Sequence, residues 1–175
     1  MSAATRVIAS EGLGAPTAAI AKEAGVSNGS LFTYFGTKAD LLNELYQELK
    51  AEMVKAASPS VATEGDAREQ MLHVWSNWLQ WATSYPEKRR ALAHLSVSDA
   101  ITPERLQTAR QTTAGMARLV ERSRERGPMR EAPLGFVLAL MNAMADTTID
   151  FMVRDPENAD MHRKTGFDAL WRMLG

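Results

Sequence analysis

The segment that decides the fold is IAKEAGVSNGSLFTYFGTKADLL, residues 20–42. Its first part has helical periodicity, and Gly25 then supplies the permissive backbone that a sharp turn needs. Ser27 is a natural N-cap for a second short helix, in which Leu31 and Phe35 fall at helical spacing. Two short helices joined by a turn of about three or four residues that contains glycine form a helix-turn-helix.

By spacing alone, the same pattern also fits an ordinary helical hairpin. The residue types on the outer face of the second helix favour a binding helix, because they are small or can form hydrogen bonds. A helix that enters a DNA major groove about 12 Å wide needs such a surface. Glycine within a helix costs about 1 kcal/mol relative to alanine, and steric room for a close partner would explain it. These outer residues are Asn28, Gly29, Ser30, Thr33 and, at the edge, Tyr34.

Three further expectations concern the ends and the core of this segment. The hydroxyl of Thr17 is a natural N-cap for the first helix. A third helix should begin at Thr37 and Lys38, where a hydroxyl, free N–H groups and an ammonium group would together bind a phosphate. The apolar side chains that should pack inside are Val26, Leu31 and Phe35.

Composition excludes several classes of protein. The chain has 175 residues, 45% of them hydrophobic, with 20 Lys+Arg, 21 Asp+Glu and no cysteine. This rules out disorder, disulfide scaffolds and thiol chemistry. We expect a cytoplasmic protein, because no apolar run approaches the roughly 18 residues of a membrane span and the start lacks a secretory signal. The net charge of −1 argues against coating nucleic acid through bulk positive charge.

Residues 20–42 resemble the TetR family of bacterial transcriptional regulators. The likeness also includes Ala3-Ala4 and Gly12 upstream, and it departs from the family at Phe32, where tyrosine is usual. The family's first helix normally begins several residues before the paired alanines. The matching residues are Thr17, Ile20-Ala21, Ala24-Gly25-Val26-Ser27, Gly29-Ser30-Leu31, Tyr34-Phe35, Lys38 and Leu41-Leu42.

The resemblance implies a DNA-binding head on a helical body that dimerises and usually holds a small effector. We therefore expect an all-α fold of about nine helices, with a three-helix head at 1–46 whose first helix is short, and a ligand-binding and dimerisation body at 47–175. Asn28 and Thr33 are the predicted base readers, and Gly29 and Ser30 would permit close approach, with Ser30 as a further candidate reader. The other residues would bind phosphate, which positions the protein on the DNA. The predicted DNA-binding residues are Thr17, Ser27, Asn28, Gly29, Ser30, Thr33, Tyr34, Thr37 and Lys38.

The body contains an aromatic segment, REQMLHVWSNWLQWATSY, that is apolar around much of its circumference. Plain core packing is one explanation, and the wall of a pocket for an apolar or aromatic effector is the other. The predicted pocket residues are His73, Trp75, Trp78, Leu79, Met116, Leu119, Met141 and Met144.

The two C-terminal helices carry the predicted dimer interface. Residues 136–145 are apolar nearly all round, so this helix should bury two faces, and the last helix is amphipathic. In the TetR family these helices pair with their copies in a four-helix interface, which predicts a two-fold dimer. The predicted interface residues are Phe136, Leu140, Phe151, Phe167, Leu170, Trp171 and Leu174.

No enzyme is predicted. His73, His94 and His162 lack metal-ligand spacing, and neither a phosphate-binding loop nor a nucleophile elbow occurs, so we expect no catalytic residue, metal or cofactor. The predicted function is a repressor that a small apolar or aromatic effector releases from a palindromic double-stranded DNA operator. The alternative is a helical small-molecule carrier whose head does not bind DNA. Neither hypothesis involves a membrane.

Overall fold

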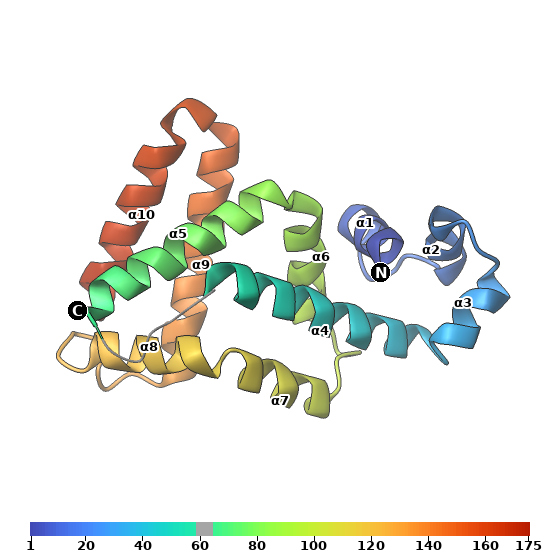
Figure 1. Ribbon diagram of the computed structural model, residues 1–175, viewed down its shortest axis with the longest axis horizontal. Helices are drawn as coiled ribbons and strands as arrows, with labels where there is room; N and C mark the ends of the chain where they lie inside the picture. Colours follow the sequence, from blue (N-terminus) through green and yellow to red (C-terminus); the bar gives the residue numbers. More distant parts are fainter. Residues whose placement is uncertain (59–64) are drawn as a thin grey trace. The chain divides into compact units, whose positions relative to one another are not determined.

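The computed structural model describes residues 1–58 and 65–175, which form ten α-helices, one short 3₁₀ helix and no strand (Figure 1). The all-α prediction is therefore confirmed, with a helix count close to the expected nine. Two compact units are present. The first contains residues 1–52 and 85–112, and the second contains residues 53–84 and 113–175.

The first unit is built around the N-terminal helices. Helix α1 packs against both α2 and α6, and α2 packs against α3. Ala4, Ile8 and Ile20 are almost fully buried and supply much of its core. Residues 85–112 thus fold together with the N-terminal segment, whereas the functional division at residue 46 stays a prediction. The helices are α1 (Ser2–Glu11), α2 (Thr17–Ala24), α3 (Asn28–Tyr34), α4 (Lys38–Ala57), α6 (Pro86–Ser96) and α7 (Pro103–Thr112). Helix α4 belongs to this unit as far as residue 52.

The turn between α2 and α3 forms as the sequence predicts. Gly25 ends α2 in the left-handed conformation, with φ +70°, which glycine adopts without steric cost. The Ser27 Oγ then accepts a hydrogen bond from the N–H of Ser30 at 3.0 Å and caps α3. The Thr17 prediction is wrong in one respect. Thr17 is the first residue of α2, and Pro16 occupies the N-cap without a side-chain hydrogen bond.

Burial in this unit follows helical periodicity on the long helix and departs from it on the short one. Leu41, Leu45 and Leu49 form a buried stripe on α4. Helix α3 has only seven residues, and Leu31 is its single buried one. Val26 was expected in the core, but it is 43% exposed because the turn carries its side chain outward. Phe35 is half-buried, so the core prediction holds only in part for it.

In the second unit, α5 packs against α8, α9 and α10. Trp75 is buried at its centre and donates its Nε1–H to the carbonyl oxygen of Arg163 at 3.1 Å. At Gly166 an added Cβ would lie 2.4 Å from the Thr148 Oγ1, so the lack of a side chain lets α10 approach α9 closely. The helices are α5 (Ala67–Ser84), α8 (Ala114–Arg124), α9 (Leu134–Arg154) and α10 (Ala159–Leu174), with the 3₁₀ helix at Pro156–Asn158.

Helix α9 is more apolar than a surface helix needs to be. It has 21 residues and a mean hydropathy of 1.4 over an 18-residue window, enough to cross a membrane by length and composition alone. The expectation that no apolar run reaches this length was therefore wrong. Val137, Met141, Ala145 and Ile149 form its buried face. Only 28% of the window is buried, so much of its apolar surface is not covered by the residues that the structure describes.

Candidate nucleic-acid interface

The outer surface of α3 is accessible along the helix. Its predicted reading residues Asn28, Gly29, Ser30 and Thr33 are all exposed. Tyr34 at the end of the helix is 81% exposed. The structure therefore brings together on one short helix the small and hydrogen-bonding side chains that the sequence singled out.

The hydrogen bonds on α3 define which polar groups are still available. Ser30 is engaged with Ser27, since their hydroxyls lie 2.8 Å apart. The Thr33 hydroxyl donates to the carbonyl oxygen of Gly29 at 3.2 Å, which leaves the lone pairs of its oxygen free to accept. Among the described residues, Asn28 has no side-chain partner. Asn28 and Thr33 are thus the groups best placed to bind another molecule.

Gly29 has no packing reason to be glycine. A Cβ built at this position would meet nothing closer than the Ser27 Oγ at 3.8 Å, which is an ordinary contact. Its φ also lies outside the left-handed region. The lack of a side chain therefore gives room on the outer side of α3, where an approaching partner would benefit from it.

The N-terminus of α4 already holds a carboxylate. The N–H and the hydroxyl of Thr37 both donate to the Asp40 Oδ2, at 2.9 and 2.8 Å, and the Asp40 N–H donates back to the Thr37 Oγ1 at 3.1 Å. This is a reciprocal cap in which a negative charge satisfies the free donors of the first turn. In this structure Asp40 engages the donors of Thr37, and the phosphate site at Thr37 stays a prediction.

Lys38 points inward. Its ammonium group donates to the carbonyl oxygens of Leu13 at 2.7 Å and Ala15 at 2.6 Å, in the loop between α1 and α2. The prediction of a phosphate ligand is therefore corrected to that of a tie between α4 and the 12–16 loop. No pattern in the sequence indicates this contact, because the two acceptors are backbone groups 25 and 23 residues away.

The remaining cations of residues 1–46, all of which the structure describes, are few. Arg6 pairs with Glu23 at 2.6 Å. Lys22 lies in the last turn of α2, is exposed and has no partner among the described residues. Contacts to a DNA backbone would therefore depend mainly on hydroxyl and backbone N–H groups.

Comparison with known proteins agrees with this geometry. Residues 1–45 match the family model for bacterial regulatory proteins of the tetR family. A TetR-family transcription regulator from Shewanella sp. PV-4 is 27% identical, with a TM-score of 0.84 over 97% of this chain and 93% of that one. Residues 1–45 are therefore similar to the tetR family, and the whole chain shares the fold of this regulator.

Two further TetR-fold structures extend the likeness over nearly the whole chain. A TetR-family regulator from Marinobacter aquaeolei VT8 has a TM-score of 0.86 at 22% identity, covering 99% of this chain and 92% of that one. A fatty acid degradation regulator from Bacillus halodurans has a TM-score of 0.70 at 19% identity, covering 99% and 97%. The TetR fold therefore includes the body as well as the head.

The second unit carries an open apolar groove along α9 and α10, with a volume of about 600 Å³. Phe151 and Met161 on this groove are 50% and 53% exposed, and Phe136 on the same helix as Phe151 is 55% exposed. The groove residues with large or titratable side chains are Leu140, Met144, Phe151, Met161 and His162.

The interface prediction is wrong for three of its residues. Phe167, Leu170 and Leu174 are at most 2% exposed because they face the core of their own subunit. Trp171 is half-buried and stacks on Phe167 with ring centroids 6.4 Å apart. Periodicity identified an apolar stripe on α10 correctly, but that stripe packs inward.

The predicted effector-pocket residues do not form one surface. Trp75, Leu79, Leu119 and Met141 lie in the core of the second unit. His73 is exposed, which removes it from a buried wall, and Met144 lines the groove of α9 and α10. Trp78 and Met116 are half-buried, and Trp78 packs edge-to-face on Trp75 at 6.4 Å. An effector pocket around α5 stays a prediction.

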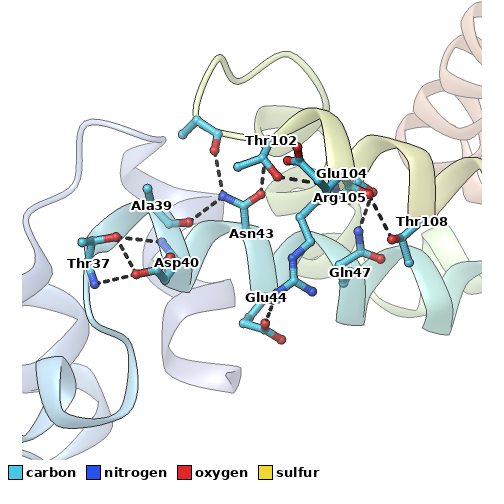
Figure 2. Close-up of polar contacts among 11 residues, drawn as sticks. Thr37, Ala39, Asp40, Asn43, Glu44, Gln47, Thr102, Glu104, Arg105 and Thr108 are labelled. Atoms are coloured by element: carbon cyan, nitrogen blue, oxygen red, sulfur yellow. Dashed lines mark hydrogen bonds and ion pairs between the residues drawn. The ribbon is translucent and has the colours of Figure 1, made fainter.

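Several polar groups of functional interest were missed by the sequence reasoning. Asn43, next to the leucine stripe of α4, is buried and hydrogen-bonded to the segment before α7 (Figure 2). Burial lowers the pKa of the Lys50 ammonium group on the same helix. Burial also raises the pKa of the Tyr46 hydroxyl, which the charge of Arg110 partly opposes. An asparagine beside buried leucines was the one signal in the sequence.

The histidines give no metal centre. No group of three or more His, Asp and Glu side chains within the described residues could hold a metal ion. The His162 Nε2 lies 2.8 Å from the Asp155 Oδ2. This hydrogen bond, with a smaller effect from Asn158, lowers the pKa of the Asp155 carboxyl group.

Proposed function

We propose that this TetR-family protein is a ligand-responsive repressor that binds a palindromic operator as a homodimer in the cytoplasm. The observation that carries the proposal is the outer face of α3. Asn28, Gly29 and Thr33 are exposed together, while Leu31 anchors the helix from behind. Amide and hydroxyl groups of this kind match base edges in the major groove.

A second copy of the chain is the proposed occupant of the groove on α9 and α10. The exposed side chains there are large and apolar, as Phe151 and Met161 show. Monomeric proteins rarely leave such patches uncovered. Since one head has few groups that can contact phosphates, pairing also supplies the second half-site contact that tight binding needs.

The proposed effector is a small apolar or aromatic molecule held by the body. The aromatic content of α5 supports this choice, because binding pockets are mostly apolar with a few polar groups. Binding would change the separation of the two heads and release the operator. A likeness to a fatty acid degradation regulator from Bacillus halodurans is compatible with an apolar effector.

The test is a binding assay with a duplex that this protein selects from a random-sequence library. We expect selection of a palindromic sequence, an affinity that falls with salt, and a dimeric mass by light scattering. A shallow salt slope is expected, because few cations of the head are free. Failure to enrich any sequence would contradict the proposed repressor function.

One observation favours the alternative, a helical carrier of small molecules with a non-functional head. Arg6 and Lys38 are both engaged within the chain, which leaves Lys22 as the free cation of residues 1–46. Ligand screening by tryptophan fluorescence separates the two functions. A ligand that binds without any effect on DNA binding would favour the carrier.

A further inference from the structure

A buried amide joins the long helix α4 to the turn that precedes α7. Asn43 is 4% exposed. Its Nδ2 donates to the carbonyl oxygens of Ala39 at 2.8 Å and Ala100 at 2.7 Å, and its Oδ1 accepts from the N–H of Thr102 at 3.0 Å. Figure 2 shows the amide reaching from α4 to this backbone. Two of the three bonds connect residues 57 and 59 positions apart in the chain.

Neighbouring side chains of α4 hold the same segment. One turn after Asn43, the Gln47 Nε2 donates to the carbonyl oxygen of Arg105 at 2.5 Å. The Arg105 guanidinium pairs with the carboxylate of Glu44. That ion pair is partly exposed and contributes little by itself. Together, Asn43, Glu44 and Gln47 form what we call the α4 clamp on residues 100–105.

The clamp restrains the position of α4 along its own axis, which apolar packing does not fix. The leucine stripe of α4 draws the helix into the unit, but apolar contact is non-directional and tolerates small shifts along the helix axis. Hydrogen bonds depend steeply on distance and angle. A shift of α4 relative to Ala100 and Thr102 would break bonds of a buried amide, which is costly. The position of α4 is therefore set by the backbone of 100–105.

The reading helix depends on that position. Helix α3 ends at Tyr34 and α4 begins at Lys38. At 1.5 Å per residue, Asn43 lies only about 8 Å along the axis from the start of α4. A change in the angle or register of α4 is thus passed almost directly to α3.

We propose that Asn43 is a positioning residue for DNA binding, and that the α4 clamp and the occupancy of α3 by DNA stabilise each other. The inference rests on the proposed function, because it needs DNA on α3. Coupling of two sites is reciprocal. An intact clamp therefore strengthens DNA binding, and bound DNA tightens the clamp.

The experiment follows the exchange of the Thr102 N–H by NMR or mass spectrometry, with and without the selected duplex, in the full chain. The variant Asn43→Leu keeps the volume and removes the hydrogen bonds. Gln47→Leu is a milder second variant at a half-buried position. Ser123→Ala is the matched control, because it removes a buried side-chain hydrogen bond in the second unit, to the Leu119 carbonyl at 2.8 Å.

We expect the duplex to slow Thr102 exchange in the parent protein by about tenfold, and Asn43→Leu to weaken duplex binding by a similar factor. The slope of affinity against salt should stay unchanged, since no phosphate contact is lost. Ser123→Ala should bind as the parent does. If Asn43→Leu does not fold, a threefold or greater loss of duplex affinity in Gln47→Leu would support the clamp inference.

Two results would overturn the inference alone. One is a Thr102 N–H exchange rate in the parent protein that the duplex does not change. The other is an affinity within threefold of the parental value in every clamp variant that folds. A parent protein that binds no duplex would instead overturn the proposed function, and the clamp inference with it.

Discussion

The Lys38 ammonium group lies 2.6 Å from the carbonyl oxygen of Ala15. The first residue of α4 therefore binds the loop that precedes α2. A second bond to the Leu13 carbonyl oxygen shares the same ammonium group. The positive charge of Lys38 thereby supports the internal geometry of the head, and we expect its effect on DNA binding to be indirect.

Lys38→Met is the first prediction. It should lower the thermal stability and weaken binding to every duplex alike, while the slope of log affinity against log salt stays at the parental value. Loss of a phosphate contact would instead reduce the slope by about 0.9 for each head. Lys22→Met, which removes the exposed free cation of α2, is the control that should reduce the slope.

Gly29→Ala should separate stability from binding. Alanine favours the helix and has room inside the chain, so we expect a gain of about 0.5 kcal/mol in the free energy of unfolding. The added methyl group would obstruct the close approach of DNA, and operator affinity should fall about tenfold. Denaturant titration and anisotropy measure the two quantities. A variant that binds as tightly as the parent would show that DNA does not approach α3 at this position.

Thr33→Val should alter sequence preference. The Thr33 hydroxyl proton is donated to the Gly29 carbonyl, so its oxygen is expected to accept from a base amino group. Valine keeps the shape and removes the oxygen, which should relax discrimination at one base pair in each half-site by about 1–3 kcal/mol. Repeated selection from a random library measures it, with Thr33→Ser as the variant that should retain the preference. Equal losses on all sequences would assign Thr33 to a backbone contact.

Phe151→Glu should produce a folded monomer. A carboxylate in the middle of the proposed paired face would have to be buried without a partner, which is costly. Light scattering should give half the parental mass with the helical circular dichroism retained. Val97→Glu replaces an apolar residue that is 83% exposed in the first unit, and it should stay dimeric. A dimeric Phe151→Glu protein would show that this face is not the dimer interface.

Lys50 predicts a pH dependence of stability. Burial lowers the pKa of its ammonium group, so between that lowered value and the unfolded value of about 10.4 the unfolded chain binds more protons. Stability should therefore rise with pH through this window, and the burial cost is fully present below the lowered pKa. Lys50→Met should raise the melting temperature at pH 7 by about 2–4 °C, with the gain shrinking toward pH 10. A lower melting temperature at pH 7 would mean that Lys50 is stabilised by its surroundings.

The sequence was most informative where a short stretch determines its own geometry. The Gly25 turn and the Ser27 cap form as predicted, because their partners lie within a few residues. Lys38 and Asn43 could not be assigned, since their acceptors are backbone atoms brought close only by the folded chain. Periodicity likewise found the apolar stripe of α10 but could not tell whether Phe167 faces its own subunit or a partner.

The uncovered apolar surface of α9 has a consequence for mixed populations of this protein. A subunit with an intact α9 and α10 but a weakened reading helix, such as one carrying Thr33→Val together with Gly29→Ala, would still be able to pair with a second chain. It would pair with normal subunits, and each mixed pair would then contain only one fully functional DNA-binding head. Co-expression of such a subunit should therefore reduce DNA binding by the normal subunits in proportion to its dose, as a dominant-negative inhibitor.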